Sequence, residues 1–330
     1  MRRLAVLAAA VPLLFAAACG GGQGGGDAST PAGTASASSA ASGPPASVDD
    51  LKVSGKTGEK PKVTFPTGMM PPTTSAAKTV TKGDGEAVRA GDNVIVNLTA
   101  YAWDGQSNAM VGSTYDEGSP QVLKVGDGLP KVIDTAFQQA KVGDRFFAVV
   151  AVDSLSKEQL EQAKAQGTDK MASLYVIDVV ARATKKAASG KEVKAGVKGI
   201  TLENPGGDAA PKLSTKTGEK APTELVAKTV IEGTGPKVKS GQGVLVHYVG
   251  KIWGTDKEFD SSWNRGAPVM FQIGTGKVIK GWDQGLVGVP VGSRVLLVIP
   301  PKLGYGEQGQ GDVIKGTDTL VFVVDVLGAY

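Results

Sequence analysis

Short apolar runs rich in β-branched residues alternate along the chain with stretches rich in Gly, Pro and Asp, a pattern typical of β-strands joined by tight turns. The clearest runs cover residues 94–101, 145–152, 174–180, 244–253, 294–300 and 320–327. One segment differs, because Ile279 and Trp282 stand three residues apart within 278–286, as on one face of a short helix. We therefore predict an α+β fold in which an antiparallel β-sheet wraps around one short α-helix.

This pattern occurs twice along the chain. Residues 77–80, Ala-Lys-Thr-Val, return at 227–230, and the Gly and Val positions that follow keep the same spacing. Lys-Thr-Gly-Glu-Lys at 56–60 likewise returns at 216–220. The strand-like piece 199–202 of the second half is mirrored by 63–65 in the first. The sequence thus predicts two copies of one domain, at 48–183 and 191–330, with a short polar linker between them.

The N-terminus resembles a bacterial lipoprotein signal. Arg2-Arg3 is followed by an apolar run, 4–18, that is short for a membrane span, so 1–18 is expected to be an export signal. Cys19, the one cysteine, follows Ala18 and precedes Gly20, as in a lipoprotein box, although Ala16 stands where leucine is commoner. The expected location is the extracytoplasmic face of a bacterial cell membrane, with a lipidated Cys19 as the anchor. The alternative is an ordinary signal peptide that leaves Cys19 as a free thiol.

Residues 19–47 consist almost entirely of small and polar residues, with no apolar periodicity. Such a segment cannot bury enough apolar surface to offset its ordering entropy, so we expect a disordered tether. The whole sequence is 41% hydrophobic and 21% charged, which suffices for two ordinary cores. Its net charge of +4 does not indicate a nucleic-acid partner.

The sequence offers no cofactor or metal motif. The glycines at 274–276 and 304–311 lack the spacing of phosphate-binding loops. His247 is the only histidine and, with Cys19, has no plausible partner ligands, so no metal is expected and His247 is interpreted as structural.

Aromatic residues gather around one carboxylate in the C-terminal third. Tyr248 is followed by Phe259-Asp260, then by Val278-Ile279 and Trp282, and finally by Tyr305 in a glycine-rich loop. This arrangement resembles the proline-binding cup of the FKBP-type peptidyl-prolyl isomerases, and the resemblance covers the second copy. The fold it implies for each copy is the FKBP-like α+β domain.

The resemblance implies a role for each matching residue. Trp282 would form the floor of the cup, and the backbone N–H of Ile279 and the hydroxyl of Tyr305 would bind substrate carbonyls. Asp260 would face the twisting amide and pair with Arg265 through a charge-assisted hydrogen bond. The expected catalytic residues are Tyr248, Phe259, Asp260, Val278, Ile279, Trp282, Tyr305 and Phe322. The expected substrate-binding residues are Arg265, Val269 and Ile314.

A dry aromatic cup suits this reaction. The barrier to rotation about the peptide bond, ~18–20 kcal/mol, comes from amide resonance, so no nucleophile is needed. Removing water disfavours the planar dipolar amide and favours the twisted one. The expected partners are proline-containing exported polypeptides and macrolides of the rapamycin type.

Three positions depart from the family pattern, namely Val269, Gln310 and Lys277, where an aromatic, a histidine and an acidic residue are usual. With Lys280, Lys302 and Lys315, Lys277 would give a basic rim, which predicts a preference for acidic residues before proline. In the first copy, Leu98, Ile133 and about Ser156 replace the Tyr, Trp and Tyr of the cup, Tyr115-Asp116 keeps the Phe-Asp pair, and Tyr175 replaces Phe322. The first copy is therefore expected to be a spacer or a polypeptide-binding module.

The alternative function is a non-catalytic binding or chaperone lipoprotein with the same fold. Taken singly, Phe259, Trp282 and Phe322 are also compatible with ordinary core packing. The joint pattern of Trp282, Asp260 and Tyr305 favours the enzyme.

Overall fold

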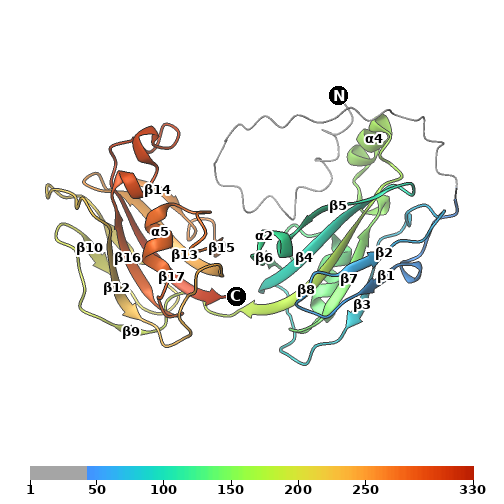
Figure 1. The fold of residues 1–330 in the computed structure, drawn as a ribbon, viewed down its shortest axis with the longest axis horizontal. Coiled ribbons are helices and arrows are strands. Elements are labelled where there is room, and N and C mark those ends of the chain that lie inside the picture. The colour runs from blue at the N-terminus through green and yellow to red at the C-terminus, as the bar shows by residue number, and fades with distance from the viewer. Residues whose placement is uncertain (1–42) are drawn as a thin grey trace. The chain divides into compact units, whose positions relative to one another are not determined.

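The computed structural model describes residues 43–330, which form two compact units (Figure 1). The first unit holds the described chain up to Ala181, except for two short segments, and the second begins at Arg182. The two excepted segments, Asp92–Ile95 and Glu117–Leu123, are grouped with the second unit. The predicted signal peptide, the lipidation of Cys19 and most of the tether lie outside the described residues. No helix among residues 43–330 is long and apolar enough to cross a membrane.

The last residues of the predicted tether are ordered. Pro45 forms a β-bridge with Met70, Ala46 is buried, and Ser47 caps a 3-10 helix, η2 (Val48–Asp50). The prediction of a disordered tether up to residue 47 is therefore wrong at its end, because these residues pack on the first unit.

The second unit is built on one antiparallel sheet. Its strands run in the order β14 (Glu258–Ser261), β13 (Gly243–Ile252), β17 (Leu320–Ala329), β16 (Arg294–Ile299), β12 (Val226–Glu232) and β9 (Lys191–Glu192), and β15 (Val269–Gln272) also pairs with β13. One short helix, α5 (Lys280–Leu286), packs on this sheet. These elements agree with the strands and the helix that the apolar pattern predicts.

Two glycines let α5 approach β16 closely. A Cβ atom on Gly281 would lie 2.5 Å from the Ile299 side chain, and one on Gly285 would lie 2.6 Å from Leu297. Both distances are far below van der Waals contact, so the helix keeps its position only with bare Cα atoms there. Trp282 and Leu286 are thereby pressed into the core between helix and sheet.

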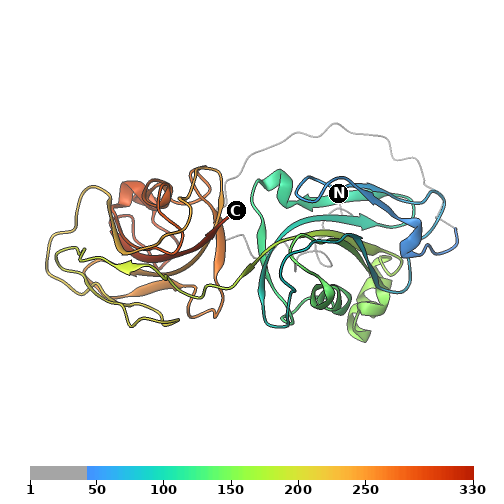
Figure 2. The same ribbon diagram turned by 90° about the horizontal axis from the view of Figure 1, so that it is seen from below.

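The other face of this sheet is also covered. A hairpin of β10 (Thr201–Glu203) and β11 (Lys212–Ser214) contributes Leu202 and Leu213 to a second apolar cluster with Val298, Val321 and Val323. Figures 1 and 2 show α5, in orange, and this hairpin, in yellow-green, on opposite sides of the sheet. The core that holds Trp282 is thus separated from the outer cluster by the sheet itself.

The first unit has a related arrangement. Its sheet runs β3 (Ala76–Thr81), β7 (Arg145–Val150), β8 (Ala172–Ala183), β4 (Asn93–Trp103) and β5 (Asn108–Ser113), and β6 (Gln121–Lys124) pairs with β4. Helix α3 (Lys131–Gln139) contributes Ile133 and Phe137 to the interior. A hairpin of β1 (Lys52–Ser54) and β2 (Lys62–Thr64) lies beside the outer cluster that contains Trp103 and Phe147.

The first unit contains helices that the sequence pattern did not predict. They are the single turn α2 (Thr114–Glu117) and the longer α4 (Lys157–Gln166). Ser156 and Gln159 form a capping box at the start of α4, and Gly167 ends the helix in the left-handed conformation. Helix α4 begins just after Ser156, where the sequence predicts only a counterpart of Tyr305. The prediction of a single helix in this copy is therefore wrong.

A buried ion pair lies on each sheet. Arg145 donates to Asp178 in the first unit, with Nε 2.5 Å from Oδ1, and Arg294 donates to Asp325 in the second, with a corresponding distance of 2.6 Å. Arg145 also donates to the carbonyl oxygens of Gly55 and Glu59. The pair therefore fastens the β1–β2 hairpin to the sheet of the first unit.

The repeated Lys-Thr-Gly-Glu-Lys motif does not occupy equivalent positions. Its first occurrence forms the turn between β1 and β2, whereas the second follows β11. Similarly, 63–65 belongs to the second strand of its hairpin and 199–202 leads into the first strand of the other. These short matches are thus weaker guides to equivalence than the strand register.

Candidate active site

The aromatic residues of the second unit converge on one concave face of its sheet. Tyr248 comes from β13, Phe259 from β14 and Phe322 from β17, while Trp282 comes from α5. The register pairs Gly250 of β13 with Phe322 on one side and with Asp260 on the other. The sheet therefore places the predicted walls and the carboxylate next to one another.

Trp282 lies at the bottom of this cluster and is only 4% exposed. Its ring meets Tyr248 and Phe322 edge to face, with centroids 5.3 Å away in both cases. Phe259 in turn meets Phe322 at 5.4 Å. The indole Nε1 is buried and has no hydrogen-bond partner among the described residues. The cup consists of the rings of Tyr248, Phe259, Trp282 and Phe322, with Trp282 as its floor.

The sequence analysis missed Phe271. Its ring centroid lies 5.2 Å from that of Trp282 and 6.0 Å from that of Tyr248. Phe271 stands two residues after Val269 in β15, so both side chains leave the strand on one face. That alternation was the available signal, and Phe271 supports the floor of the cup from the side of β15.

A hydrogen-bonded network joins the carboxylate to the cup. The Tyr248 hydroxyl and the Arg265 guanidinium both donate to Asp260, and Arg265 Nη2 lies 2.8 Å from the Tyr248 hydroxyl oxygen. The Arg265 guanidinium carbon is 5.5 Å from the Tyr248 ring centroid. Burial, together with the hydrogen bond to Asp260, raises the pKa of Tyr248 to about 12. The hydroxyl is therefore protonated at neutral pH and holds Asp260 in one orientation.

Two further hydrogen-bond donors belong to residues that pack against the same core. Ile279 precedes the first residue of α5, and its N–H has no acceptor among the described residues. The Tyr305 hydroxyl likewise has no hydrogen bond within the described chain. Burial, with the Asp260 carboxylate as the second cause, raises the pKa of Tyr305. Tyr305 thus carries a proton that a bound acceptor could receive as a hydrogen bond.

The remaining predicted residues surround the cup. Val269, Val278 and Ile279 pack against the same core, and Ile314 is buried within it. The backbone N–H of Gln310 donates to the Ile314 carbonyl, with N 2.8 Å from O, and Ile314 N–H donates back. Gln310 therefore acts through its backbone, by closing the loop that carries Ile314.

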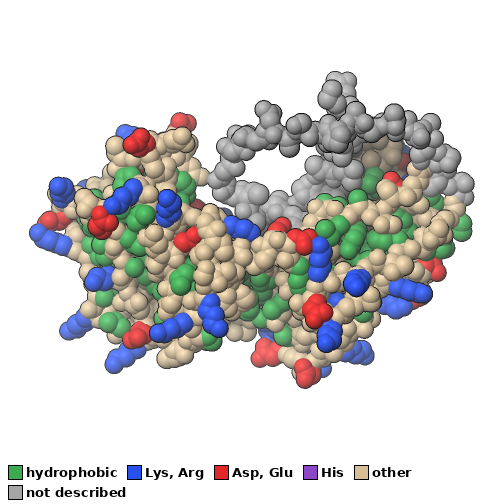
Figure 3. All heavy atoms as spheres, viewed as in Figure 1, with side chains coloured by type: hydrophobic (Ala, Val, Ile, Leu, Met, Phe, Trp, Pro, Cys, Tyr) green, Lys and Arg blue, Asp and Glu red, His purple; other side chains and the backbone are tan. Residues whose placement is uncertain are grey.

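The basic rim remains a prediction, and one member is already paired. Lys302 Nζ lies 2.7 Å from Glu224 Oε1. Lys315 stands in a loop that also contains Asp312 and Asp318. On the face drawn in Figure 3, basic and acidic side chains are interspersed over the second unit.

His247 lies behind the cup and has structural partners. Its ring stacks on Trp263 with centroids 4.1 Å apart, and Nδ1 lies 2.9 Å from Ser262 Oγ, which also accepts the Tyr248 N–H. Burial lowers the pKa of His247 to about 4 despite the opposing effect of Asp325. Residues 43–330 contain no group of three His, Cys, Asp or Glu side chains that could hold a metal ion.

The strand register corrects the alignment of the first unit. There, Ala100 pairs with Gly112, and the Leu98 N–H donates to Thr114 Oγ1. In the second unit the corresponding partners are Gly250 with Asp260 and Tyr248 with Ser262. Gly112 therefore stands where Asp260 stands, and Tyr115 corresponds to Trp263. The prediction that Tyr115-Asp116 keeps the Phe-Asp pair is wrong, because both residues follow the end of β5 and lie in α2, beyond the position of Asp260.

The first unit lacks further parts of the cup. Ile133 occupies the place of Trp282 in its helix, and Pro130, which has no N–H, precedes that helix as Ile279 precedes α5. Ser156 caps α4 and does not stand in for Tyr305. The Tyr115 hydroxyl donates to Asp178.

Comparison with known proteins identifies the class of the second unit. The family model described as FKBP-type peptidyl-prolyl cis-trans isomerase matches residues 235–327. The FK506-binding protein of Streptomyces anulatus is 50% identical over 111 residues, which cover 33% of this chain and 90% of that protein. The probable FK506-binding protein of Corynebacterium glutamicum is 43% identical over 109 residues, with the same coverage. The crystal structure of AtFKBP13 matches with 40% identity and a TM-score of 0.31, covering 33% of this chain and 96% of that one.

The chain therefore belongs to the family of FKBP-type peptidyl-prolyl cis-trans isomerases. The family resemblance that the aromatic pattern predicts is confirmed for this part of the second unit.

Proposed function

We propose that the second unit catalyses cis-trans isomerisation of Xaa-Pro bonds in exported polypeptides. Its family membership gives the reaction. The observation that supports the site most directly is the cup itself, in which a buried Trp282 floor is flanked by two donors without internal acceptors, Ile279 N–H and Tyr305 O–H.

The cup would lower the barrier by excluding water. The prolyl ring would rest on Trp282 between Tyr248 and Phe322, whose rings pack edge to face around the floor. Away from water the planar amide loses the solvation that stabilises its dipolar form, whereas the twisted amide loses less. Each tenfold acceleration needs about 1.4 kcal/mol of such preference for the twisted state.

The donors and Asp260 would hold the substrate while one carbonyl rotates. Ile279 N–H and Tyr305 O–H would bind carbonyl oxygens on either side of the twisting bond. Asp260 is fixed by Tyr248 and Arg265, so its negative charge would face the rotating carbonyl in a constant orientation. The polypeptide segment would thereby be anchored at its ends and free to rotate at one bond.

The first unit would be a second, degenerate copy of the same domain that does not catalyse this reaction. Gly112 in place of Asp260, Ile133 in place of Trp282 and Pro130 in place of Ile279 support this assignment. The shared helix position, strand register and buried ion pairs support the common origin.

We further propose that the chain is a lipoprotein held on the extracytoplasmic face of a bacterial membrane by Cys19. Arg2-Arg3, the apolar run and the position of Cys19 before Gly20 support this proposal. Labelling of growing cells with an alkyne fatty acid should mark the wild-type chain and leave Cys19→Ala unmarked. Equal labelling of both chains would contradict the anchor.

Macrolides of the rapamycin type would compete for the same cup, as the names of the FK506-binding relatives suggest. The alternative function is a lipoprotein that binds peptides in the same cup without catalysing isomerisation. The two functions are distinguished by whether the chain raises the rate of isomerisation.

The test is catalysed cis-to-trans isomerisation of an Ala-Leu-Pro-Phe reporter by the full chain. Tyr305→Phe and Asp260→Val should lower kcat/KM by about tenfold or more, equal to at least about 1.4 kcal/mol. Tyr330→Phe is the matched control, because Tyr330 is half-buried in the same unit and its pKa is also raised by burial. Unchanged rates in Tyr305→Phe and Asp260→Val would favour the binding alternative.

A further inference from the structure

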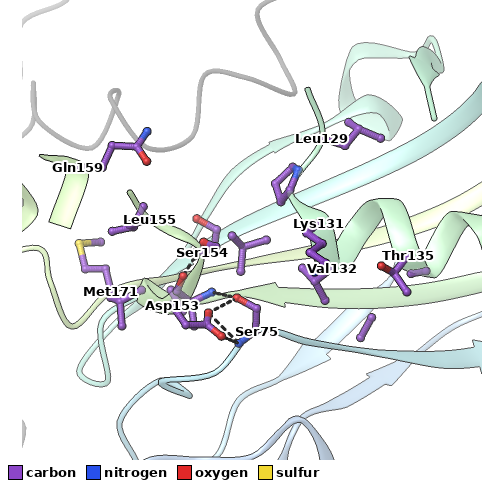
Figure 4. Close-up of a pocket in the computed structure, with 18 of the residues that line it drawn as sticks. Ser75, Leu129, Lys131, Val132, Thr135, Asp153, Ser154, Leu155, Gln159 and Met171 are labelled. Atoms are coloured by element: carbon purple, nitrogen blue, oxygen red, sulfur yellow. Dashed lines mark hydrogen bonds between the residues drawn. The ribbon is translucent and has the colours of Figure 1, made fainter. Parts of the chain in front are cut away.

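A large groove lies in the first unit, on the side of its sheet that carries α3. It measures about 970 Å³ and is bounded by the edge strand β3, by α3 and by α4 (Figure 4). This volume is at the upper end of the roughly 300–1,000 Å³ found for ligand sites. Its lining includes Leu129 and Pro130, which stand where Val278 and Ile279 stand in the second unit, but not Leu98, Ile133 or Tyr175. The groove therefore adjoins the position of the cup and extends from it to α4, which has no counterpart among the described residues of the second unit.

The groove offers accessible apolar surface. Leu129, Val132, Ala136, Leu155 and Met171 line it, and each of these side chains is only half-buried. Figure 4 shows Val132 on α3 and Leu155 and Met171 from the segments that flank α4. Apolar side chains from three separate segments thus converge on one hollow, where they could be covered by apolar groups of a partner.

The backbone of β3 borders the same groove. Ala77, Lys78 and Thr79 all line it, although successive side chains of a strand point to opposite faces, so the groove reaches the edge of the strand. β3 ends the strand order of its sheet and pairs with β7 alone among the described strands. In the second unit, β12 pairs with β16 and also with β9. No further strand pairs with the outer edge of β3 within the described residues, although η2 contacts this strand and its Asp49 pairs with Lys78.

The charges along the groove are unequal. Asp153 is satisfied by Ser75, whose backbone N–H and hydroxyl both donate to its carboxylate. Lys78 pairs with Asp49. Lys131, at the start of α3, is exposed and has no ion-pair partner among the described residues. The α3 side of the groove therefore carries a positive charge at Lys131, whereas Asp153 keeps its negative charge beside Ser75.

We propose that this groove binds an extended polypeptide segment, which adds as a strand to β3 and places alternate apolar side chains against α3 and α4. An acidic residue of the segment would face Lys131. Backbone hydrogen bonds to β3 give affinity without regard to sequence, and the apolar hollow selects every second side chain. The proposal does not rest on isomerase activity, since the occupant needs no proline.

The experiment measures fluorescence anisotropy of a labelled peptide, Glu-Val-Thr-Val-Thr-Val-Glu, titrated with the full chain. Saturable binding is expected. A peptide with alternate amides N-methylated, which cannot pair as a strand, should bind at least about tenfold more weakly. Ala136→Glu and Leu155→Glu should weaken binding by a similar factor, and Lys131→Glu should reverse the preference between this peptide and one flanked by lysines. Lys131 is exposed, so its replacement tests the groove even where the apolar replacements perturb folding.

Isomerase rates of the same variants distinguish the groove from the cup of the second unit. All three positions lie in the first unit, so the rates should not change. Equal binding of the N-methylated peptide would overturn the proposal, as would full binding by the Ala136 and Lys131 variants. Self-association of the chain that Ala136→Glu abolishes, without peptide binding, would also overturn it and assign the groove to a second copy.

Discussion

Phe259 and Phe322 meet edge to face with ring centroids 5.4 Å apart, directly over the bare Cα of Gly250. A Cβ atom on Gly250 would lie 2.7 Å from the ring of Phe259 and 2.9 Å from that of Phe322. The two walls of the cup can therefore touch only because β13 carries glycine at the position that pairs with both strands.

Gly250→Ala should accordingly part the two rings. We expect kcat/KM to fall about tenfold and the second unit to lose about 1–3 kcal/mol of stability through overpacking. The isomerisation assay and urea unfolding measure the two effects. Gly218→Ala is the control, since a Cβ there meets nothing within 4 Å. Wild-type activity in Gly250→Ala would contradict the assignment of these rings as walls.

Arg265 is expected to matter more for activity than for stability. Its side chain is 47% exposed and that of Asp260 is 38% exposed, so their ion pair should contribute at most about 1 kcal/mol to folding. Arg265→Leu releases both Asp260 and the Tyr248 hydroxyl, and should lower kcat/KM by roughly tenfold. Arg265→Lys should restore only part of the rate, because an ammonium group lacks the fork that reaches both partners. A large loss of stability with an unchanged rate would show a purely structural role.

His247 should make the stability of the second unit depend on pH. Its pKa falls from 6.5 in the unfolded chain to about 4 in the folded one, mainly through burial. The unfolded state therefore binds a proton first as the pH falls, so stability is full above about pH 6.5 and is lost progressively toward pH 4. The expected loss between pH 7.5 and 4.5 is about 1–3 kcal/mol.

Urea unfolding followed by tryptophan fluorescence measures this loss, in a Trp103→Phe background that leaves tryptophans in the second unit alone. His247→Asn is the comparison, because Asn97 fills the corresponding place beside Thr114 in the first unit. The difference between pH 7.5 and 4.5 should shrink in that variant. The same pH dependence with and without His247 would exclude the histidine as its source.

Removing the buried ion pair of one unit should affect the stability of that unit alone. Arg294→Leu leaves Asp325 unpaired at 1% exposure and should destabilise the second unit by about 3–5 kcal/mol. Arg145→Leu should destabilise the first unit to a similar degree and leave isomerase activity intact. Thermal unfolding and the isomerisation assay, applied to both variants, test this. Loss of activity in Arg145→Leu would mean that catalysis depends on the first unit.

Much of the second unit can be predicted from its sequence. The strands follow from β-branched runs, and the cup follows from Phe259-Asp260 and Trp282 in a spacing that resembles the family. Phe271 was missed because the alternation with Val269 in a four-residue strand indicates a shared face but not which rings that face meets. Its position became evident only from the packing of β15 against α5.

The first unit is harder to predict, for two physical reasons. Ala100 pairs with Gly112, 12 residues further on, whereas Gly250 pairs with Asp260, 10 residues further on. Matching residue types placed Tyr115-Asp116 in the cup, whereas this pairing excludes them. Helix α4 depends on a capping box and a glycine stop inside a segment with weak apolar periodicity. Helix α4 therefore depends on its capping residues, and the hydrophobic pattern did not indicate it.

The measurement that tests the central claim most directly is the isomerisation rate of an Xaa-Pro reporter with Trp282→Leu in the full chain. The control is Trp253→Leu, since Trp253 belongs to the same unit but packs on the outer face of the sheet, where its Nε1 donates to the Glu219 carbonyl. We predict that Trp282→Leu, folded as judged by circular dichroism, loses at least about tenfold in kcat/KM, whereas Trp253→Leu retains the wild-type rate. Equal rates in the two variants would contradict the account of Trp282 as the floor of the catalytic cup.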